Sequence, residues 1–355
     1  MRPLTRFAWL TLAYNIAVIL WGAYVRATGS GAGCGNRWPL CNGTVLPRTP
    51  QAQTIIEFTH RLTSALAVVM VSSLLVWCWR KTSKGDWARC SSVLAILLLF
   101  NEALLGALLV LFEHVGQDRS PARVFFLCMH FGNTLLLLAA LALTAQWLSK
   151  GHRRFSVIKN RAEIVAVVFG LLATMCIGIT GSLAALGDTL FPATSLRASL
   201  IQDFSSGNIL LRLRFLHPVA AAIGAMYVLW LIVRNAKKPG RTRNQVIALA
   251  VVLIGQVGLG ILNVMLLAPV WLQIVHLLGA ELLWVLVVLA STSLLFAAVD
   301  SDSGSEVGYR LRRAWPKLLG FWFERRYGIC KAQIRGNEFS RKIHHTRWFG
   351  VNRQV

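Results

Sequence analysis

Eight long apolar runs restrict this chain to one class of fold. They cover about residues 7–25, 55–79, 91–112, 124–148, 163–185, 210–233, 245–268 and 271–299, and about 20 apolar residues suffice for a helix to cross a bilayer. Hydrophobic residues make up 55% of the 355 residues and charged residues only 14%, a balance that is rare in water-soluble domains. The sequence therefore predicts an all-α membrane protein with eight transmembrane helices.

The formal charge of +23 follows the topology of these runs. Sixteen Lys and Arg residues precede the first run or follow the second, fourth and sixth, against eight in the opposite loops. By the positive-inside rule both termini are cytoplasmic, in a multi-pass protein of the cell membrane. Residues 301–355 add a basic cytoplasmic tail with 12 Lys and Arg. The positive charge thus indicates contact with membrane lipid, and we expect no nucleic-acid partner.

The first 300 residues contain a tandem repeat. "EFTHRLTSALAV" matches "LRFLHPVAAAIG", "NEALLGALLVL" matches "GQVGLGILNVML", and "FFLCMHFGNTLLLL" matches "WLQIVHLLGAELLW". A further match aligns Thr28-Gly29-Ser30 after the first run with Thr180-Gly181-Ser182 after the fifth. Each half has four spans, so both halves cross the membrane in the same sense. We predict two tandem four-helix bundles, residues 1–150 and 151–300, related by a pseudo-twofold axis along the membrane normal.

Four of the eight histidines occupy matched positions in the repeat: His60, His130, His217 and His276. Each lies one to two turns inside a helix that starts on the outer side, roughly 8–10 Å below that face. A buried ionisable group in a membrane needs a partner or a function. The spacing gives weak support to zinc, whereas one histidine on each of two facing helices suits an axially ligated heme. We predict two bis-histidine sites, His60 with His130 and His217 with His276.

The two halves differ beside these histidines. Position 57, one turn before His60, is Glu, and the matching position in the second half is Arg214. A spacing of three residues puts Glu57 and His60 on the same helical face, where a desolvated carboxylate can serve in proton transfer. A salt bridge to Arg61 or a helix cap is the structural alternative for Glu57. Arg61 itself either snorkels to the interface or pairs with a heme propionate.

Two more carboxylates lie within the apolar runs. Glu102 matches Gln256 of the second half, and Glu281 follows His276 by five residues. For Glu102 a hydrogen-bonded structural role is favoured, and neither residue is predicted to be catalytic.

Two cysteines, Cys34 and Cys41, lie in the first outer loop, "CGNRWPLC". On the oxidising side of a membrane such a pair favours a disulfide. Because a loop this short gains only modest stability from a cross-link, a redox-active pair remains an alternative to a structural bridge.

These motifs together resemble the heme A synthase family, in its version with a cysteine pair in the first outer loop. The resemblance rests on "VRATGSGAGC", "WPLC", "EFTHR" and the histidine-bearing helices, and it covers about residues 7–299. It implies an oxidoreductase that converts a methyl group of heme O to the formyl group of heme A by successive hydroxylation, for cytochrome oxidase biogenesis. It also implies that Glu57, His60 and His130 handle the heme substrate, and that His217 and His276 hold heme b as a cofactor.

The partners implied by the resemblance are heme O, heme O synthase and cytochrome oxidase assembly factors; a homo-oligomer is left open. The alternative is a diheme, quinol-linked electron carrier of the b type that leaves its heme unchanged. An electron wire across the membrane favours hemes on opposite sides, whereas the four histidines are predicted on one side.

Overall fold

The computed structural model describes residues 1–47, 50–151, 155–157, 160–205, 207–235 and 241–298. Within these residues eight helices are long and apolar enough to cross a membrane: α1 Arg2–Ala27, α2 Ala52–Lys81, α3 Trp87–Leu111, α4 Pro121–Lys150, α5 Arg161–Leu190, α7 Ile209–Asn235, α8 Arg241–Met265 and α9 Val270–Leu295. The prediction of eight transmembrane helices in a multi-pass membrane protein is confirmed. The basic tail predicted for residues 301–355 lies outside the described residues.

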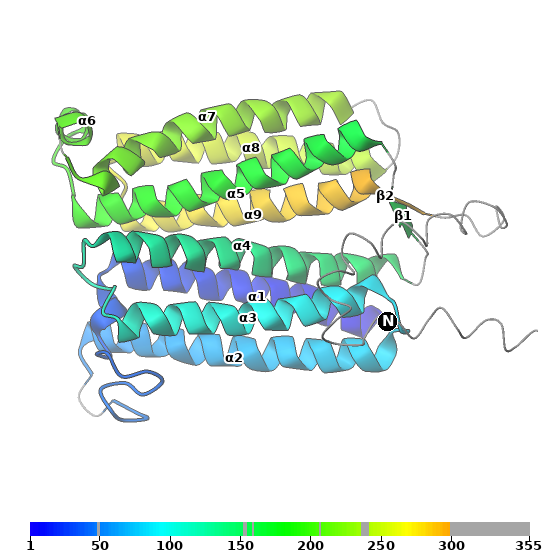
Figure 1. The fold of residues 1–355 in the computed structure, drawn as a ribbon, viewed down its shortest axis with the longest axis horizontal. Coiled ribbons are helices and arrows are strands. Elements are labelled where there is room, and N and C mark those ends of the chain that lie inside the picture. The colour runs from blue at the N-terminus through cyan, green and yellow to red at the C-terminus, as the bar shows by residue number, and fades with distance from the viewer. Residues whose placement is uncertain (48–49, 152–154, 158–159, 206, 236–240, 299–355) are drawn as a thin grey trace, which may run out of the picture.

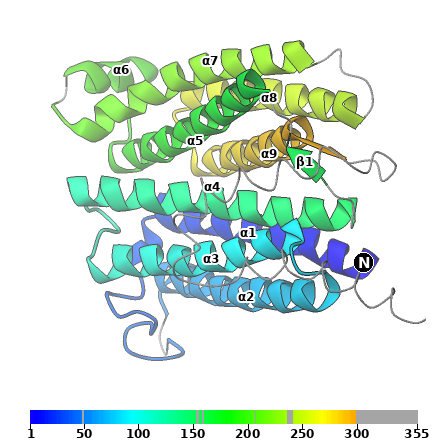
Figure 2. The same cartoon turned by 45° about the vertical axis from the view of Figure 1, so that its right-hand side comes forward.

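The helices pack in two groups that follow the chain order. Figure 1 shows α1 to α4 together on one side and α5, α7, α8 and α9 on the other, with α4 facing α5 and α9; a view turned by 45° shows the same division (Figure 2). The Trp284 indole of α9 donates a 2.6 Å hydrogen bond to the carbonyl of Leu135 in α4. In chain order the change of group lies between α4 and α5. The division into two tandem four-helix bundles and the pseudo-twofold axis stay predictions.

The side chains of α2 illustrate why these helices suit a bilayer. Val71, Leu74 and Cys78 repeat at helical spacing and are buried, whereas Leu62 and Val69 are each 59% exposed. An apolar helix face of this kind would be unfavourable in water but contacts lipid tails in a membrane. The buried face therefore packs against the other helices and the apolar outer face meets lipid.

The loops after α1, α3, α5 and α8 lie at one end of the molecule, which we call the disulfide end because Cys34 and Cys41 are bonded there. At this end Ser120 caps α4 by accepting a hydrogen bond from the Arg123 amide at 3.2 Å. The same end carries a short helix that was not predicted, α6 Leu196–Ser205. At the opposite end, β1 Phe155–Val157 pairs antiparallel with β2 Phe296–Ala298. Among the described residues, the regular secondary structure is thus helical except for this two-stranded ribbon and an isolated β-bridge between Cys41 and Thr44.

One predicted repeat match is wrong. Thr28 ends α1, but Thr180, Gly181 and Ser182 lie inside α5, which continues to Leu190. The short sequence Thr-Gly-Ser therefore has different structures in the two halves, because helix ends depend on the residues that follow and on tertiary packing.

Candidate functional site

A single large cavity reaches into both groups of helices. Its volume is about 1630 Å³, and all four matched histidines, His60, His130, His217 and His276, line it. Ligand pockets usually measure about 300–1,000 Å³, so this volume exceeds what one small ligand needs. The structure therefore brings together the four histidines that the sequence analysis selected.

The depth of the histidines is slightly greater than predicted. They lie six to nine residues after the first residue of their helices, which begin at Ala52, Pro121, Ile209 and Val270. At a rise of ~1.5 Å per residue this corresponds to roughly 9–14 Å along the helix. The difference arises mainly because α2 and α4 each begin about three residues earlier than the apolar runs indicated. The four positions still share one range of depth near the disulfide end.

Each of the four imidazoles lies against a glycine of the preceding transmembrane helix. A Cβ atom added at the glycine would lie 2.9 Å from the Cε1 of His60, 3.6 Å from that of His130, 3.0 Å from that of His217 and 3.1 Å from that of His276. The glycines are, in the same order, Gly22, Gly106, Gly181 and Gly260. Three of these distances leave no room for a methyl group without displacement of the ring. The glycines therefore set the positions of the imidazoles.

The match of "NEALLGALLVL" with "GQVGLGILNVML" aligns Gly106 with Gly260, but no sequence match aligns Gly22 with Gly181. These two are equivalent by their contacts with His60 and His217, whereas the Thr-Gly-Ser match had aligned Gly29 with Gly181. The signal that could have given the correct alignment of Gly22 with Gly181 is the presence of a glycine on the transmembrane helix before each histidine.

The geometry of the second pair fits an axially ligated macrocycle. The ring centroids of His217 and His276 are 6.4 Å apart, with an angle of 76° between the ring planes. A metal–imidazole nitrogen bond is about 2 Å long, and two such bonds plus half of each ring span roughly 6 Å. Among the described residues, the buried Nδ1 atoms of His60, His130 and His276 have no hydrogen-bond partner. The spacing, the glycines and the cavity together fit heme better than they fit a closed protein core.

Glu102 and Gln256 confirm their predicted equivalence, because each contacts the histidine of the next transmembrane helix. Glu102 Oε1 lies 3.1 Å from His130 Nδ1, within ion-pair distance but without the geometry of a hydrogen bond. Its carboxylate also accepts hydrogen bonds from Asn133, at 2.5 Å, and from Thr134. Gln256 Nε2 donates to the carbonyl of His276 at 3.1 Å and lies 3.4 Å from its Nε2. The first half thus has a carboxylate where the second has a neutral amide.

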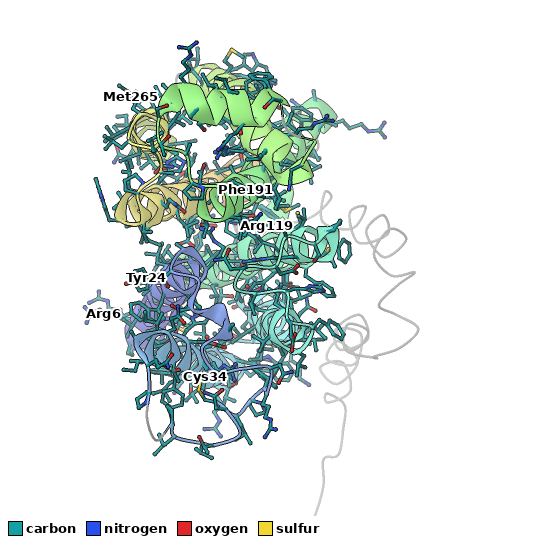
Figure 3. All side chains as sticks on the ribbon, turned by 90° about the vertical axis from the view of Figure 1, so that its left-hand side faces the viewer. Arg6, Tyr24, Cys34, Arg119, Phe191 and Met265 are labelled. Atoms are coloured by element: carbon teal, nitrogen blue, oxygen red, sulfur yellow. A yellow bond between two sulfur atoms is a disulfide. The ribbon has the colours of Figure 1, made fainter. Side chains whose placement is uncertain are left out.

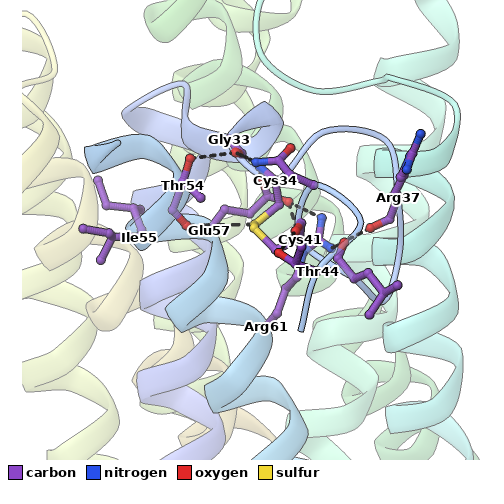
Figure 4. The surroundings of a disulfide bond; sticks show 12 residues. Gly33, Cys34, Arg37, Cys41, Thr44, Thr54, Ile55, Glu57 and Arg61 are labelled. Atoms are coloured by element: carbon purple, nitrogen blue, oxygen red, sulfur yellow. Dashed lines mark hydrogen bonds and ion pairs between the residues drawn. A yellow bond between two sulfur atoms is a disulfide. The ribbon is translucent and has the colours of Figure 1, made fainter. Parts of the chain in front are cut away.

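Glu57 and Arg61 hold the disulfide loop against α2 (Figure 4). The Cys34 amide donates to Glu57 Oε2 at 2.7 Å, and Arg61 Nη2 lies 2.5 Å from Glu57 Oε1. Arg61 Nη1 also donates to the carbonyls of Arg37, Pro39 and Leu40 at 3.1, 3.4 and 2.8 Å. The Glu57 residue is only 3% exposed and lines the cavity. The salt bridge that the sequence analysis named as the structural alternative is therefore present, and Arg61 is engaged by protein groups.

Cys34 and Cys41 form a disulfide, as predicted. Both cysteines are buried, with 0% and 2% exposure. The Thr54 hydroxyl of α2 donates to the carbonyl of Gly33 at 2.8 Å, next to Cys34. The first two turns of α2, which carry Thr54 and Glu57, thus hydrogen-bond to the loop next to the disulfide.

Arg214 holds α6 and the loop before it in a related way. It donates from Nε to Asp203 Oδ1 at 2.8 Å, its Nη2 lies 2.6 Å from the same oxygen, and its Nη1 lies 3.4 Å from Asp188 Oδ1. It also donates to the carbonyls of Phe191 and Ser199 at 3.2 and 3.3 Å. At the position that matches Glu57, the second half therefore has a buried cation with two carboxylate partners of its own.

Comparison with known proteins agrees with this geometry. Residues 5–288 match the family model COX15-CtaA, described as cytochrome oxidase assembly protein. A heme A synthase of Shouchella clausii is 30% identical over 297 residues, which are 80% of this chain and 95% of that protein. A heme A synthase of Halalkalibacterium halodurans is 40% identical over 142 residues, 40% of this chain and 45% of that protein.

A longer relative also matches. A protein of Thermus thermophilus named protoheme IX farnesyltransferase is 44% identical over 313 residues, which are 86% of this chain but 51% of that protein. The chain thus spans about half the length of this relative. The match over residues 5–288, together with the relative covered almost end to end, shows that the chain belongs to the cytochrome oxidase assembly protein family that includes the heme A synthases.

Proposed function

We propose that this protein is a heme A synthase that oxidises one methyl group of heme O to the formyl group of heme A. The observation that carries the proposal is the cavity lined by two histidine pairs, each imidazole set against a glycine. Membership of a family that contains named heme A synthases supports the substrate. In this proposal His60 and His130 hold the heme substrate, and His217 and His276 hold heme b.

The asymmetry of the halves supports this assignment of roles. At the matched repeat positions the first half has carboxylates, Glu57 before His60 and Glu102 beside His130, whereas the second half has Arg214 and Gln256. A reaction centre needs groups that move protons or offset developing charge, while a bound electron carrier needs mainly ligands and an apolar slot. His217 and His276 would hold heme b, which would supply one-electron redox chemistry next to the first site.

Two successive hydroxylations would convert the substrate methyl to a gem-diol, which loses water to give the aldehyde. With water as the source of oxygen, each hydroxylation replaces one C–H hydrogen with a hydroxyl group and releases two electrons and two protons, and a one-electron carrier held by His217 and His276 would accept the electrons one at a time. Glu57 is held by the Cys34 amide and by Arg61, and its charge is offset by the Arg61 guanidinium. A carboxylate fixed in this way favours stabilisation of positive charge on the substrate, with proton transfer as the alternative role. Because the Cys34 amide holds Glu57, the disulfide loop positions this carboxylate.

We further propose the orientation of the protein in the membrane and one partner enzyme. Both termini face the cytoplasm by the charge rule, which puts the disulfide end on the outer side. The match to a protein named protoheme IX farnesyltransferase supports heme O synthase as a functional partner.

The test is to express the protein in a host that makes heme O but no heme A, extract the pigments and measure their masses. The wild type should yield heme A. Glu57→Gln should lose most of this product and keep its bound heme b, whereas Glu113→Gln, which neutralises an exposed carboxylate at the same end, should behave as the wild type. A folded, heme-loaded wild type that yields only heme B and heme O favours the diheme electron carrier instead.

A further inference from the structure

Two arginines at the disulfide end, the partly buried Arg26 and the buried Arg123, lack a carboxylate partner among the described residues. Arg26 Nη1 donates to the Thr189 hydroxyl at 3.2 Å, and its Nη2 donates to the side-chain oxygen of Gln273 at 3.3 Å. Arg123 is 5% exposed, and its Nη1 donates to the carbonyls of Gly116 and Asp118 at 2.8 and 2.7 Å. All of these acceptors are neutral oxygens, and no carboxylate of the described residues lies within ion-pair distance of either guanidinium.

The other arginines that line the cavity differ in this respect. Arg61 is paired with Glu57, and Arg214 with Asp203 and Asp188. Asp188 attracts Arg26, but its carboxylate is engaged by Arg214. An unpaired buried charge is costly, and a bound anion would offset that cost.

The carboxylate of Asp118 near Arg123 is likewise committed elsewhere. Its Oδ2 accepts from the Ser120 hydroxyl at 2.8 Å and lies 2.9 Å from His114 Nδ1. Burial raises the pKa of Asp118, but the hydrogen bonds from Ser120 and His114 outweigh burial and leave the pKa below its usual value. The Asp118 carboxylate is therefore held by Ser120 and His114. The Arg123 guanidinium contacts the backbone carbonyl of Asp118 instead.

Arg26 and Arg123 both line the cavity and influence each other electrostatically. Arg26 lies in the last turn of α1 and hydrogen-bonds to Thr189 of α5 and Gln273 of α9. Arg123 lies in the first turn of α4. Figure 3, which views the molecule from the disulfide end, shows these helix ends where the two groups meet. A guanidinium has five N–H donors, so each arginine keeps donors for a further acceptor.

Both arginines are particular to the first half. Arg26 follows Gly22 by four residues, and Ala185 follows the equivalent Gly181 by four. Arg123 precedes His130 by seven residues, and Pro269 precedes His276 by seven. The two cations thus accompany the histidine pair His60 and His130 and are absent from the matching positions of the other pair.

We propose that Arg26 and Arg123 form the subsite that binds the carboxylate side chains of the porphyrin substrate. The inference rests on the proposed function for the identity of the substrate. Bidentate contacts of guanidinium with carboxylate are strong and directional, so they would fix the rotation of a flat macrocycle within its plane. That rotation determines which ring methyl faces the reacting groups, which makes the two arginines positioning residues for the selection of one methyl.

The test measures binding rather than turnover. The full-length protein, purified with its bound heme, is titrated with iron protoporphyrin IX and, separately, with its dimethyl ester, which lacks the negative charges. The Soret shift reports each affinity. The wild type should bind the dicarboxylate at least about tenfold more tightly than the ester, and Arg26→Gln or Arg123→Gln should remove most of that preference.

Control variants keep the result interpretable. Arg119→Gln removes an exposed cation from the loop before α4 that does not line the cavity, and it should keep the wild-type ratio. Arg123→Lys preserves the charge if Arg123→Gln fails to fold, and should retain part of the preference. Equal affinity of the wild type for the acid and the ester would overturn the inference without the need for any variant.

An anionic lipid headgroup could bind the same two arginines. A second measurement distinguishes it from the porphyrin carboxylates. If the glutamine variants keep the porphyrin ratio but lose a bound anionic phospholipid in native mass spectrometry, the subsite belongs to lipid and the inference is wrong. A wild type that makes heme A yet binds acid and ester equally overturns this inference alone. A wild type that prefers the acid but makes no heme A overturns the proposed function alone.

Discussion

The contact between Gly260 and His276 gives the sharpest test of the histidine site. In Gly260→Ala, the new Cβ would lie 3.1 Å from His276 Cε1, whereas carbon atoms pack best at roughly 3.5–4.0 Å. The ring must therefore move by about 0.4 Å. Metal–ligand distances in a good site vary by only about 0.2 Å, so the displacement exceeds what an axial ligand accommodates.

A matched control lies on the same helix. A Cβ at Gly258, two residues before Gly260 in α8, would meet no atom within 4 Å. Both substitutions replace a glycine inside a helix by alanine, and this replacement alone should stabilise the fold by about 0.5–1 kcal/mol. Gly258→Ala should therefore keep its heme and gain slightly in thermal stability. Gly260→Ala should share the helical gain and lose heme occupancy, or change from a six-coordinate to a five-coordinate heme spectrum.

The assay combines the heme-to-protein ratio, the visible and EPR spectra of the purified variants, and a thermal melt. Gly181→Ala, with a Cβ 3.0 Å from His217 Cε1, should repeat the effect from the other side of the pair. If Gly260→Ala and Gly181→Ala both retain full occupancy and an unchanged low-spin spectrum, the glycines do not set the imidazole positions and the fit argument fails.

Three further predictions concern stability. Replacing both Cys34 and Cys41 by Ser removes a cross-link between residues seven apart in sequence and should lower the free energy of unfolding by about 2.5 kcal/mol; an unchanged melting temperature would contradict this. Arg214→Met leaves the buried Asp203 and the partly buried Asp188 without their cation and should cost about 3–5 kcal/mol, whereas Arg212→Met, at an exposed position, should cost far less in the same melts. Glu281 is fully buried, and both its carboxylate oxygens lack a partner among the described residues, so Glu281→Leu should stabilise the fold by about 1–3 kcal/mol; a clear loss of stability would reveal a counter-charge.

Local patterns predicted the elements well because membranes impose a simple rule. A span needs a long apolar run with all backbone groups bonded inside one helix, so hydropathy alone located the eight helices. The repeat of His60, His130, His217 and His276 could be read in the same way, because an ionisable residue stands out in an apolar run. The cysteine pair was predicted from its spacing and its expected compartment.

Contacts between distant residues could not be read from those patterns. The short Thr-Gly-Ser match misplaced the register of α5, since helix ends depend on packing beyond the local sequence. Arg61 was assigned either to the interface or to a propionate, yet it binds Glu57 and three loop carbonyls. Side-chain partners of this kind follow from which loop folds over which helix.

By itself the sequence determined the number of apolar spans and singled out the four histidines that line the cavity, because hydrophobicity and charge act residue by residue. Only the tertiary structure decided which glycine faces each imidazole, that one cavity reaches both pairs, and that Arg26 and Arg123 line this cavity with no carboxylate of the described residues within ion-pair distance. These features depend on how helices far apart in the chain approach one another, and that approach is set by the fit of many side chains at once.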